Sequence, residues 1–345
     1  MKYLILVICL VLAAVVGKGV FFALSSPGQP ENKWVYMVKE GASFNQVASE
    51  LYKKNLISSE LEFKIMGRIS GYTTKIRTGE YALHGGMKPI EILRVISSGK
   101  SVTYPITFPE GYNMFEMAEL AEKKGIATAK QFLAYCHDSQ FIKTILGDNV
   151  ETLEGYLFPE TYQVTRSEGA RGLIKLMVRR FLQVYGEVAH LAPTNGFTRH
   201  QWVILASIIE KETGYEKERG LISSVFHNRL KKNMRLQTDP TVIYGKMMQT
   251  GAPVKNITKK DLRTKNSYNT YTFRGLPKGP ISNPGRAALL SAFQPDDTEF
   301  LYFVSRNDGT SKFSETLKEH NSAVRKYQLN RNNRVGKSWR DLDQD

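Results

Sequence analysis

The clearest pattern in the chain is an apolar run close to its N-terminus. Residues 4–24 carry one charged side chain, Lys18, and are otherwise apolar. As a helix this run would be about 31 Å long, which is enough to cross the hydrocarbon core of a bilayer. We therefore expect a cytoplasmic stub at residues 1–3, a transmembrane anchor at residues 4–24 and a linker at residues 25–33.

The same run also fits a cleaved signal peptide. Its first part, Leu4–Gly17, has the length of the apolar segment of a signal, and Ala23 and Ser25 are small residues typical of a cleavage site. Both interpretations carry the rest of the chain out of the cytoplasm. We expect a single-pass protein of the inner (plasma) membrane whose body faces the periplasm.

Residues 34–100 are predicted to form a small α/β module. Residues 34–38 alternate as a strand does, and residues 79–83 form a second short strand that ends before two glycines. Between them, residues 43–55 have apolar positions at helical spacing after a capping serine, and residues 59–70 follow with a second helical pattern.

Part of this module recurs further along the chain. Residues 38–56 and 108–126 align at an offset of 70 without gaps, including a Glu-Gly pair at 40–41 and 110–111. Each copy is predicted to be a strand, a turn and an amphipathic helix. Duplication and chance recurrence of a common pattern both account for this. Units of this shape resemble, in outline, LysM modules, which bind polymers of N-acetylglucosamine.

The rest of the body, residues 101–330, is predicted to be a larger, mainly helical domain with strands at its edges. Residues 171–187 and 198–212 have helical patterns, and residues 301–314 form a hairpin around an Asn-Asp-Gly turn. The predicted fold class is therefore α+β, with a transmembrane helix, a small module and a larger domain. Residues 331–345 form a polar tail.

Charge and composition narrow the partners only slightly. The chain has 48 basic and 33 acidic residues, a net charge of +15, which favours nucleic acid, a phospholipid surface or an acidic polymer. Export separates the body of the chain from nucleic acid, so we expect no nucleic acid partner. Cys9 and Cys136 cannot sensibly pair, and the histidines show no metal-ligand spacing. We expect no disulfide, metal or cofactor.

The strongest candidate for chemistry is Glu210, at the end of a predicted helix that is almost entirely apolar before it. On that helix Glu210 shares a face with Val203, Ala206 and Ser207, which are small or of modest size. A ligand could therefore approach Glu210 closely. Burial would raise the pKa of its carboxyl and keep it protonated, as a general acid needs. The alternatives are a solvated charge or a salt bridge to Lys211 or Arg219.

Three loops supply residue types that suit a sugar. Aromatic rings stack on the C–H faces of sugars, and amides pair with hydroxyl and acetamido groups. Ordinary structured turns have similar compositions. The candidate residues for substrate binding are Gln237, Thr238, Asp239, Tyr268, Asn269, Tyr271, Glu160 and Tyr162.

Six motifs follow one another along the chain: EGYLFPETY, LASIIEKET, NRLKKNMRLQTDPTVIYG, YNTY, GLPKGPISNPG and LYFVSRNDGTSKFSETLKEHN. Together they resemble the endolytic murein transglycosylase family (MltG, or YceG-like, proteins). The resemblance covers residues 34–328 in the same order. It implies a single-pass inner-membrane protein with a LysM-like subdomain in residues 34–100 and a lytic-transglycosylase catalytic domain in residues 101–330.

The resemblance also implies residue roles. In this family the first glutamate of the EKET motif is the catalytic residue, and it corresponds to Glu210 in this chain. Gln237, Asp239, Tyr268 and Asn269 match positions that line the family's cleft. The reaction it implies is endolytic and non-hydrolytic: one glutamate protonates the oxygen between N-acetylmuramic acid (MurNAc) and N-acetylglucosamine (GlcNAc), then accepts the proton of the muramyl 6-hydroxyl as a 1,6-anhydro ring closes.

Three functions are kept at this stage. The first is a lytic transglycosylase that acts on nascent glycan strands. The second is a hydrolytic muramidase, in which Glu212, Glu160 or Asp239 would be the second carboxylate. The third is a non-catalytic scaffold that binds the cell wall. The partners that we expect are peptidoglycan glycan strands, the membrane and peptidoglycan synthases.

Overall fold

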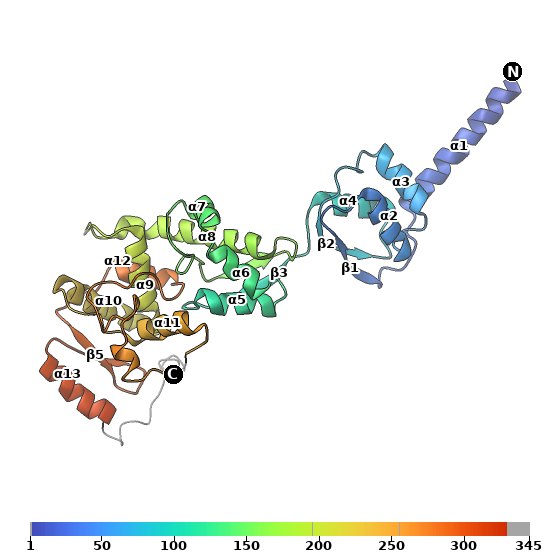
Figure 1. Ribbon diagram of the computed structural model, residues 1–345. Helices are drawn as coiled ribbons and strands as arrows, with labels where there is room; N and C mark the ends of the chain where they lie inside the picture. Colours follow the sequence, from blue (N-terminus) through green and yellow to red (C-terminus); the bar gives the residue numbers. More distant parts are fainter. Residues whose placement is uncertain (1, 195, 255, 330–345) are drawn as a thin grey trace. The chain divides into compact units, whose positions relative to one another are not determined.

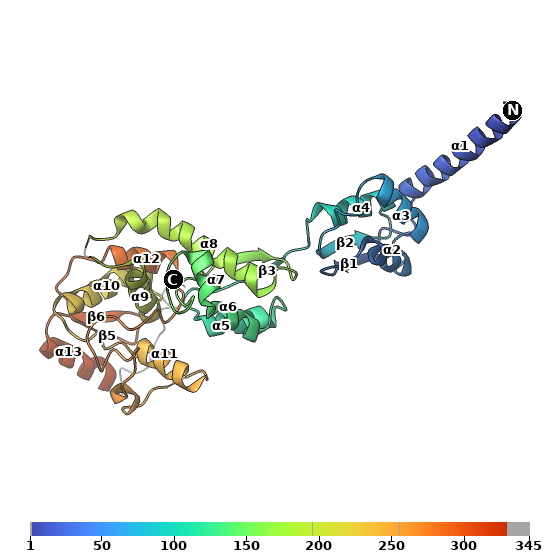
Figure 2. The same cartoon turned by 45° about the horizontal axis from the view of Figure 1, so that its top comes forward.

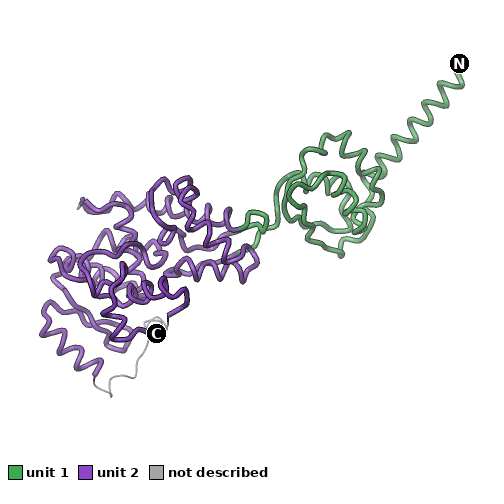
Figure 3. The backbone as a smooth tube through the Cα atoms, in the orientation of Figure 1, with its two compact units in different colours: residues 1–105, 163–169 green, residues 106–162, 170–345 purple. Residues whose placement is uncertain are grey.

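The computed structural model describes residues 2–194, 196–254 and 256–329, and the chain divides into two units (Figures 1 and 3). Unit 1 comprises residues 1–105 and 163–169, and unit 2 comprises residues 106–162 and 170–345. The chain passes between the units within two strands, β3 (Tyr104–Thr107) and β4 (Thr161–Val164), which form a small sheet. The predicted polar tail, residues 331–345, lies outside the described residues.

Unit 1 contains an antiparallel pair of strands covered by three helices (Figure 1). The register pairs Tyr36 with Tyr81, and both rings are buried. The elements of the unit are α1 (Lys2–Leu24), β1 (Lys33–Val38), α2 (Phe44–Lys53), α3 (Glu60–Ile69), β2 (Gly79–His84) and α4 (Pro89–Ser98). These bounds confirm the predicted strands and helices of the module.

Stacked aromatic rings in the core of unit 1 leave no room for a side chain at Gly67. Phe44 of α2 stacks on Phe63 of α3, with 5.6 Å between ring centroids. Gly67, one turn after Phe63, lies so close that a Cβ there would be 2.2 Å from the Phe44 ring. Phe22 of α1 is buried in the same core. The last turns of α1 are therefore packed as part of the unit.

By length and composition, α1 could cross a membrane. Its 18-residue window reaches a mean hydropathy of 2.7, and no side chain in that window is buried. Among the described residues it is the one helix with these properties.

The recurrence seen in the sequence is also a recurrence of local structure. Gly41, after β1, and Gly111, after β3, both have a φ of 75°, a conformation that glycine adopts without strain. Ser43 and Asn113 then cap helices of ten residues through reciprocal capping boxes. The two Glu-Gly segments therefore build the same strand–turn–helix unit twice.

Unit 2 is mainly helical and is organised around α9 (Arg199–Glu212), which lies among its neighbours in both views (Figures 1 and 2). Every residue of α9 from Trp202 to Ile209 is buried, and Thr198 with Gln201 forms the predicted capping box. The other helices of unit 2 are α5 (Met114–Lys123), α6 (Ala129–Cys136), α7 (Ser139–Leu146), α8 (Gly169–Val188), η1 (Ala189–Leu191), α10 (Glu216–Lys231), α11 (Asp239–Thr250), η2 (Asp261–Arg263), α12 (Arg286–Phe293), α13 (Leu317–Val324) and η3 (Arg325–Leu329).

The predicted C-terminal hairpin is present. Strands β5 (Tyr302–Ser305) and β6 (Ser311–Ser314) pair antiparallel, with Ser305 opposite Ser311 across the Asn-Asp-Gly turn. The two strands pack beside α13, which follows them. Tyr302 of β5 stacks on His320 of α13, with 5.1 Å between ring centroids. This packing brings the C-terminal motif onto one wall of the cavity described below.

Candidate active site

Glu210 is buried and fixed by its neighbours. Its side chain is 6% exposed, and its Oε2 accepts a hydrogen bond from the Gly285 backbone N–H at 2.9 Å. Arg219 lies 3.9 Å from its Oε1. Burial raises the pKa of the Glu210 carboxyl, as we predicted from the apolar helix; the Gly285 hydrogen bond lowers it and the neighbouring Glu110 raises it.

The small-residue face of α9 is not open to a ligand. The Ser207 hydroxyl accepts a hydrogen bond from the Ile281 N–H, and the Ser207 carbonyl accepts one from the Ser282 hydroxyl, both at 3.1 Å. Gly155 packs on the same face, where a Cβ would be 2.6 Å from the Val203 side chain. Backbone of the same chain therefore fills the space that the small side chains at Val203 and Ser207 leave, whereas the approach of a ligand to Glu210 itself stays a prediction.

Glu212 lies two positions further, about 200° around the helix axis from Glu210. It lines a cavity of about 450 Å³ together with Gln237, Asp239 and Tyr271, three of the residues predicted to bind substrate. The remaining residues of this cavity, which we call the Glu212 cavity, are Phe226, Arg229, Leu236, Tyr302, Phe303, Leu317, His320 and Asn321. It thus gathers residues from four of the six motifs.

The environment of Glu212 suits a carboxyl that exchanges protons near neutral pH. Burial raises its pKa to about 7. The hydrogen bond from the Thr238 hydroxyl and the charge of Arg229 lower the pKa, whereas the charge of Asp239 raises it. A group with a pKa close to the working pH can donate a proton and accept it back at comparable cost.

Hydrogen bonds from Tyr271 and Arg229 hold Asp239 and the backbone before it in place. The Tyr271 hydroxyl donates a hydrogen bond of 2.6 Å to Asp239 Oδ1. Arg229 donates from Nε to the Leu301 carbonyl and from Nη1 to the Leu236 carbonyl, at 2.7 and 2.6 Å. These bonds pin the segment that leads into Gln237.

Gln237 itself has a backbone conformation that is uncommon for a residue with a side chain. Its φ is 48°, in the left-handed region that favours glycine. Such residues concentrate at functional sites, where the surrounding structure enforces them. The surrounding structure therefore holds the backbone of Gln237, on this wall of the cavity, in a strained conformation.

Asn269 supports the cavity without lining it. Its side chain is completely buried, and its Nδ2 donates to the backbone carbonyls of Asp261, Leu262 and Thr264. Its Oδ1 accepts from the Tyr271 N–H at 3.0 Å. Because both ends of the amide are satisfied by backbone, Asn269 supports Tyr271 in this structure, and its contact with a substrate stays a prediction.

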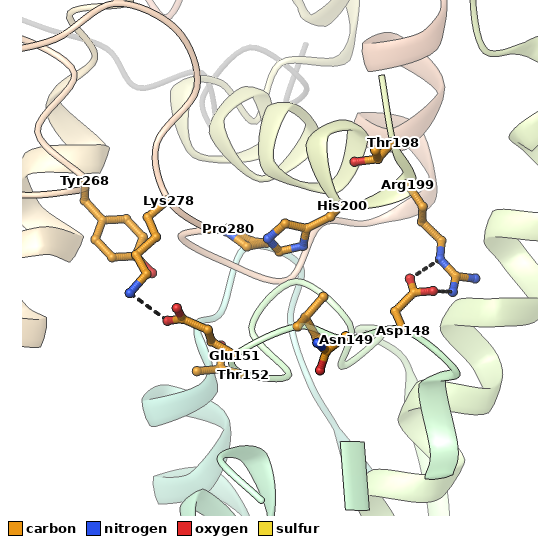
Figure 4. A pocket seen from close by; sticks show the side chains of 12 residues that line it. Asp148, Asn149, Glu151, Thr152, Thr198, Arg199, His200, Tyr268, Lys278 and Pro280 are labelled. Atoms are coloured by element: carbon orange, nitrogen blue, oxygen red, sulfur yellow. Dashed lines mark hydrogen bonds and ion pairs between the residues drawn. The ribbon is translucent and has the colours of Figure 1, made fainter. Parts of the chain in front are cut away.

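Tyr268 lines a different cavity, also of about 450 Å³, at the beginning of α9 (Figure 4). Figure 4 shows two ion pairs on its walls, between Lys278 and Glu151 at 2.8 Å and between Arg199 and Asp148 at 2.6 Å. The structure therefore does not bring Tyr268 together with Gln237 and Asp239.

Glu160 and Tyr162 lie elsewhere again. Glu160 pairs with Arg180 at 2.7 Å, and both side chains are partly exposed. The Tyr162 ring is buried, and its hydroxyl donates to the Phe158 carbonyl at 2.6 Å. Neither residue is among those that line the Glu212 cavity.

One buried carboxyl was missed as an individual residue, although its motif was noted. Glu154 is buried and accepts hydrogen bonds from the Met114 N–H, the Tyr244 hydroxyl and Asn283 Nδ2, at 2.9 to 3.1 Å. Burial raises its pKa to about 8, against the lowering by the Met114 and Tyr244 bonds. Through these hydrogen bonds the Glu154 carboxyl connects the start of α5 with α11 and with the segment before Gly285.

No group of three or more His, Cys, Asp or Glu residues placed to hold a metal ion occurs in residues 2–194, 196–254 and 256–329. The Glu212 cavity is lined by a carboxyl with raised pKa, a second carboxylate, an amide and tyrosines. Such a set can protonate a leaving oxygen and orient a polyhydroxylated substrate.

Comparisons with known proteins agree with the motifs. The YceG-like family model matches residues 36–326. A protein of Bacillus subtilis (strain 168) named endolytic murein transglycosylase is 33% identical over 310 residues, which cover 86% of this chain and 85% of that protein. A protein of the same name from Streptococcus pneumoniae (strain D39) is 26% identical over 315 residues, covering 83% of this chain but 57% of its own length.

A solved structure shows the same fold. The crystal structure of a YceG-like protein from Listeria monocytogenes superposes with a TM-score of 0.58 at 30% sequence identity. The superposition covers 84% of this chain and 99% of the Listeria chain.

Proposed function

The chain belongs to the YceG-like family, and from this premise we propose that it is an endolytic lytic transglycosylase of peptidoglycan. It would cleave the bond between MurNAc and GlcNAc within glycan strands and leave 1,6-anhydro-MurNAc ends. The observation that carries the proposal is the Glu212 cavity, in which a carboxyl with a pKa of about 7 lies beside Gln237, Asp239 and Tyr271.

We assign the acid/base role to Glu212. Glu212 lines a cavity of about 450 Å³ together with the polar residues that would bind the substrate. Glu210, which the EKET motif favoured, is the alternative assignment. Glu210 accepts a hydrogen bond from Gly285 and lies near Arg219, but Glu212 likewise accepts one from Thr238 and interacts with Arg229. Against Glu210 stands the loop that covers its face of α9. Substitution of each glutamate separately distinguishes the two assignments.

The reaction needs one carboxyl that acts twice. Protonated Glu212 donates its proton to the glycosidic oxygen, and the bond from that oxygen to the muramyl C1 breaks. The 2-acetamido group of the substrate stabilises the positive centre. The Glu212 carboxylate then removes the proton from the muramyl 6-hydroxyl, and the oxygen of that hydroxyl bonds to C1 to close the 1,6-anhydro ring. No water is consumed, and the enzyme returns to its protonated state.

A hydrolytic muramidase is the second candidate, and one observation favours it. Asp239 lines the same cavity as Glu212, so a second carboxylate is available to activate water. Glu160, which pairs with Arg180 instead, has no such placement. The hydrogen bond from Tyr271 to Asp239 would serve either reaction by fixing the carboxylate.

The products decide between these functions. Purified full-length protein is incubated with glycan strands, and the new ends are identified by mass spectrometry. The proposal predicts anhydro ends, each lighter by one water than a reducing end. Reducing ends would establish the muramidase. Binding of strands without any shortening would establish the non-catalytic scaffold.

We infer further that unit 1 is a LysM-like module that binds the same glycan. Its strand–helix–helix–strand order from β1 to β2 and its repetition in β3 and α5 support this. A direct test measures binding of GlcNAc oligomers by NMR shifts in the full-length chain. Shifts confined to unit 2 would contradict the module's role.

We also propose that α1 is a retained anchor and that both units lie outside the cytoplasm. Phe22 is buried in the core of unit 1, so cleavage before Ser25 would remove part of that core. Protease treatment of intact spheroplasts should degrade both units, and protection of the chain would contradict this orientation. Association with peptidoglycan synthases is proposed from the family resemblance and is testable by co-purification.

A further inference from the structure

The outer face of α3 in unit 1 is apolar and exposed. Leu61, Ile65 and Ile69, at intervals of four, are 67%, 50% and 82% exposed. We call these three residues the α3 stripe. Phe63 and Gly67, on the opposite side of the helix, pack on the core. A helix at the surface of a soluble unit normally presents polar residues opposite its core face, so the stripe needs a partner.

The position of α1 identifies that partner. The last turns of α1 lie against α3, and Lys18 Nζ is 3.3 Å from Glu62 Oε1 (Figure 1). Phe22, one turn after Lys18, is buried in the unit 1 core. Unit 1 is thus attached to the same turns at which a membrane-spanning α1 would leave the bilayer.

The length of α1 leaves little space between unit 1 and the bilayer. The uncharged stretch between Lys2 and Lys18, residues 3–17, would be about 22 Å long, whereas the hydrocarbon core is about 30 Å thick. Filling the core takes about 20 residues, which brings the span up to Phe22. The turns that contact α3 must then lie at or below the boundary between hydrocarbon and headgroups.

From these observations we propose that the α3 stripe inserts into the headgroup–acyl boundary of the membrane that α1 spans. Glu60 and Glu62, which flank Leu61, are paired with Lys64 and Lys18, and Arg68 is exposed three positions after Ile65. The exposed charge next to the stripe is therefore basic, which suits an anionic surface. The membrane thereby contacts unit 1 at two sites, α1 and α3, and holds unit 1 in one orientation. The inference rests on the proposal that α1 is a retained anchor.

The test measures depth in the bilayer for single labelled positions. Full-length protein in which Cys9→Ala removes the exposed thiol is reconstituted into vesicles of phosphatidylethanolamine and phosphatidylglycerol; Cys136 is buried. An environment-sensitive fluorophore is attached at Ile65→Cys. The matched control is Val35→Cys, because Val35 is an exposed apolar residue of β1 in the same unit, 57% exposed.

We expect the label at position 65 to be blue-shifted and to lose most of its emission when the lipids carry a nitroxide near the headgroup. The label at position 35 should keep its emission. Equal quenching at both positions would overturn the proposal. So would disulfide-linked dimers of the Ile65→Cys protein under mild oxidation, because a second copy would then cover the stripe.

Alkaline carbonate extraction of the same vesicles separates this inference from the anchor on which it rests. If the chain stays with the lipid while the label at position 65 is not quenched, α1 is an anchor but the proposed insertion of the α3 stripe is wrong. If the chain is released, the anchor itself is wrong and the inference falls with it. Glycan cleavage, measured by product ends, is independent of both outcomes.

Discussion

Glu210 and Glu212, two positions apart on α9, face opposite sides of the helix and meet different partners. Glu210 accepts the Gly285 N–H and lies beside Arg219. Glu212 accepts the Thr238 hydroxyl and lines a cavity of about 450 Å³. The EKET motif therefore supplies one glutamate that is bonded to the loop at Gly285 and another that lines a cavity.

Tyr271→Phe should lower kcat/KM by about tenfold, because it removes the hydrogen bond to the Asp239 carboxylate, which is worth roughly 1.5 kcal/mol or more. The unfolding temperature should change little, since the ring stays. Steady-state cleavage of glycan strands checks this. Tyr268→Phe, which alters the other cavity, is the control; an equal loss in both variants would contradict the role of Tyr271.

The pH dependence of cleavage should report Glu212. The donor is the protonated carboxyl, whose pKa burial raises from 4.5 to about 7. Activity should therefore be present below pH 7 and should fall about tenfold for each pH unit above it. A pH–rate profile of kcat/KM tests this. A rate that rises from pH 6 to pH 9 would show that Glu212 does not act as the acid.

Glu154 should make the fold less stable as the pH rises. Burial raises its pKa in the folded state from 4.5 to about 8, so the folded protein holds a proton there that the unfolded chain has lost. This contribution is fully present below pH 4.5 and disappears as the pH rises through 8. Thermal unfolding between pH 5 and pH 9 measures it.

The control for that measurement is Glu154→Gln, which has no carboxyl to titrate. Its unfolding temperature should decline less steeply over the same pH range than that of the wild type, whatever its absolute value. Parallel declines in the two proteins would exclude Glu154 as the source.

Gly155→Ala should destabilise unit 2 by about 2–4 kcal/mol. Gly155 has a φ of 86°, and a Cβ there would be 2.6 Å from Val203 and 2.7 Å from Pro280. A Cβ added at Gly186, in α8, would meet no atom within 4 Å, so Gly186→Ala should stabilise the helix by about 0.5–1 kcal/mol. Denaturant unfolding of both variants tests the contrast; similar free energies would contradict the close packing at Gly155.

The sequence alone predicted what is decided locally. The Thr198–Gln201 capping box specified the start of α9, and the Asp308-Gly309 turn specified the hairpin of β5 and β6. The burial of α9 followed from its apolar run. Each of these features depends on residues within about one or two turns of each other, where spacing and propensity suffice.

Features that depend on distant segments could not be predicted. Small residues at Val203, Ala206 and Ser207 indicate a close neighbour but not whether that neighbour is a ligand or a loop. In the structure it is the segment around Ile281, some 74 residues from Ser207. The bond between Asn283 and Glu154 spans 129 residues. Which glutamate of EKET faces a cavity is decided by such contacts.

The most direct test of the account compares Glu212→Gln with Glu210→Gln in the full-length protein. Both variants must first match the wild type in thermal unfolding to within a few degrees. Cleavage of glycan strands is then followed by mass spectrometry of the product ends. We predict that Glu212→Gln forms no anhydro ends while Glu210→Gln keeps measurable activity. If Glu212→Gln is fully active and Glu210→Gln is inactive, the assignment is contradicted and the catalytic role belongs to Glu210.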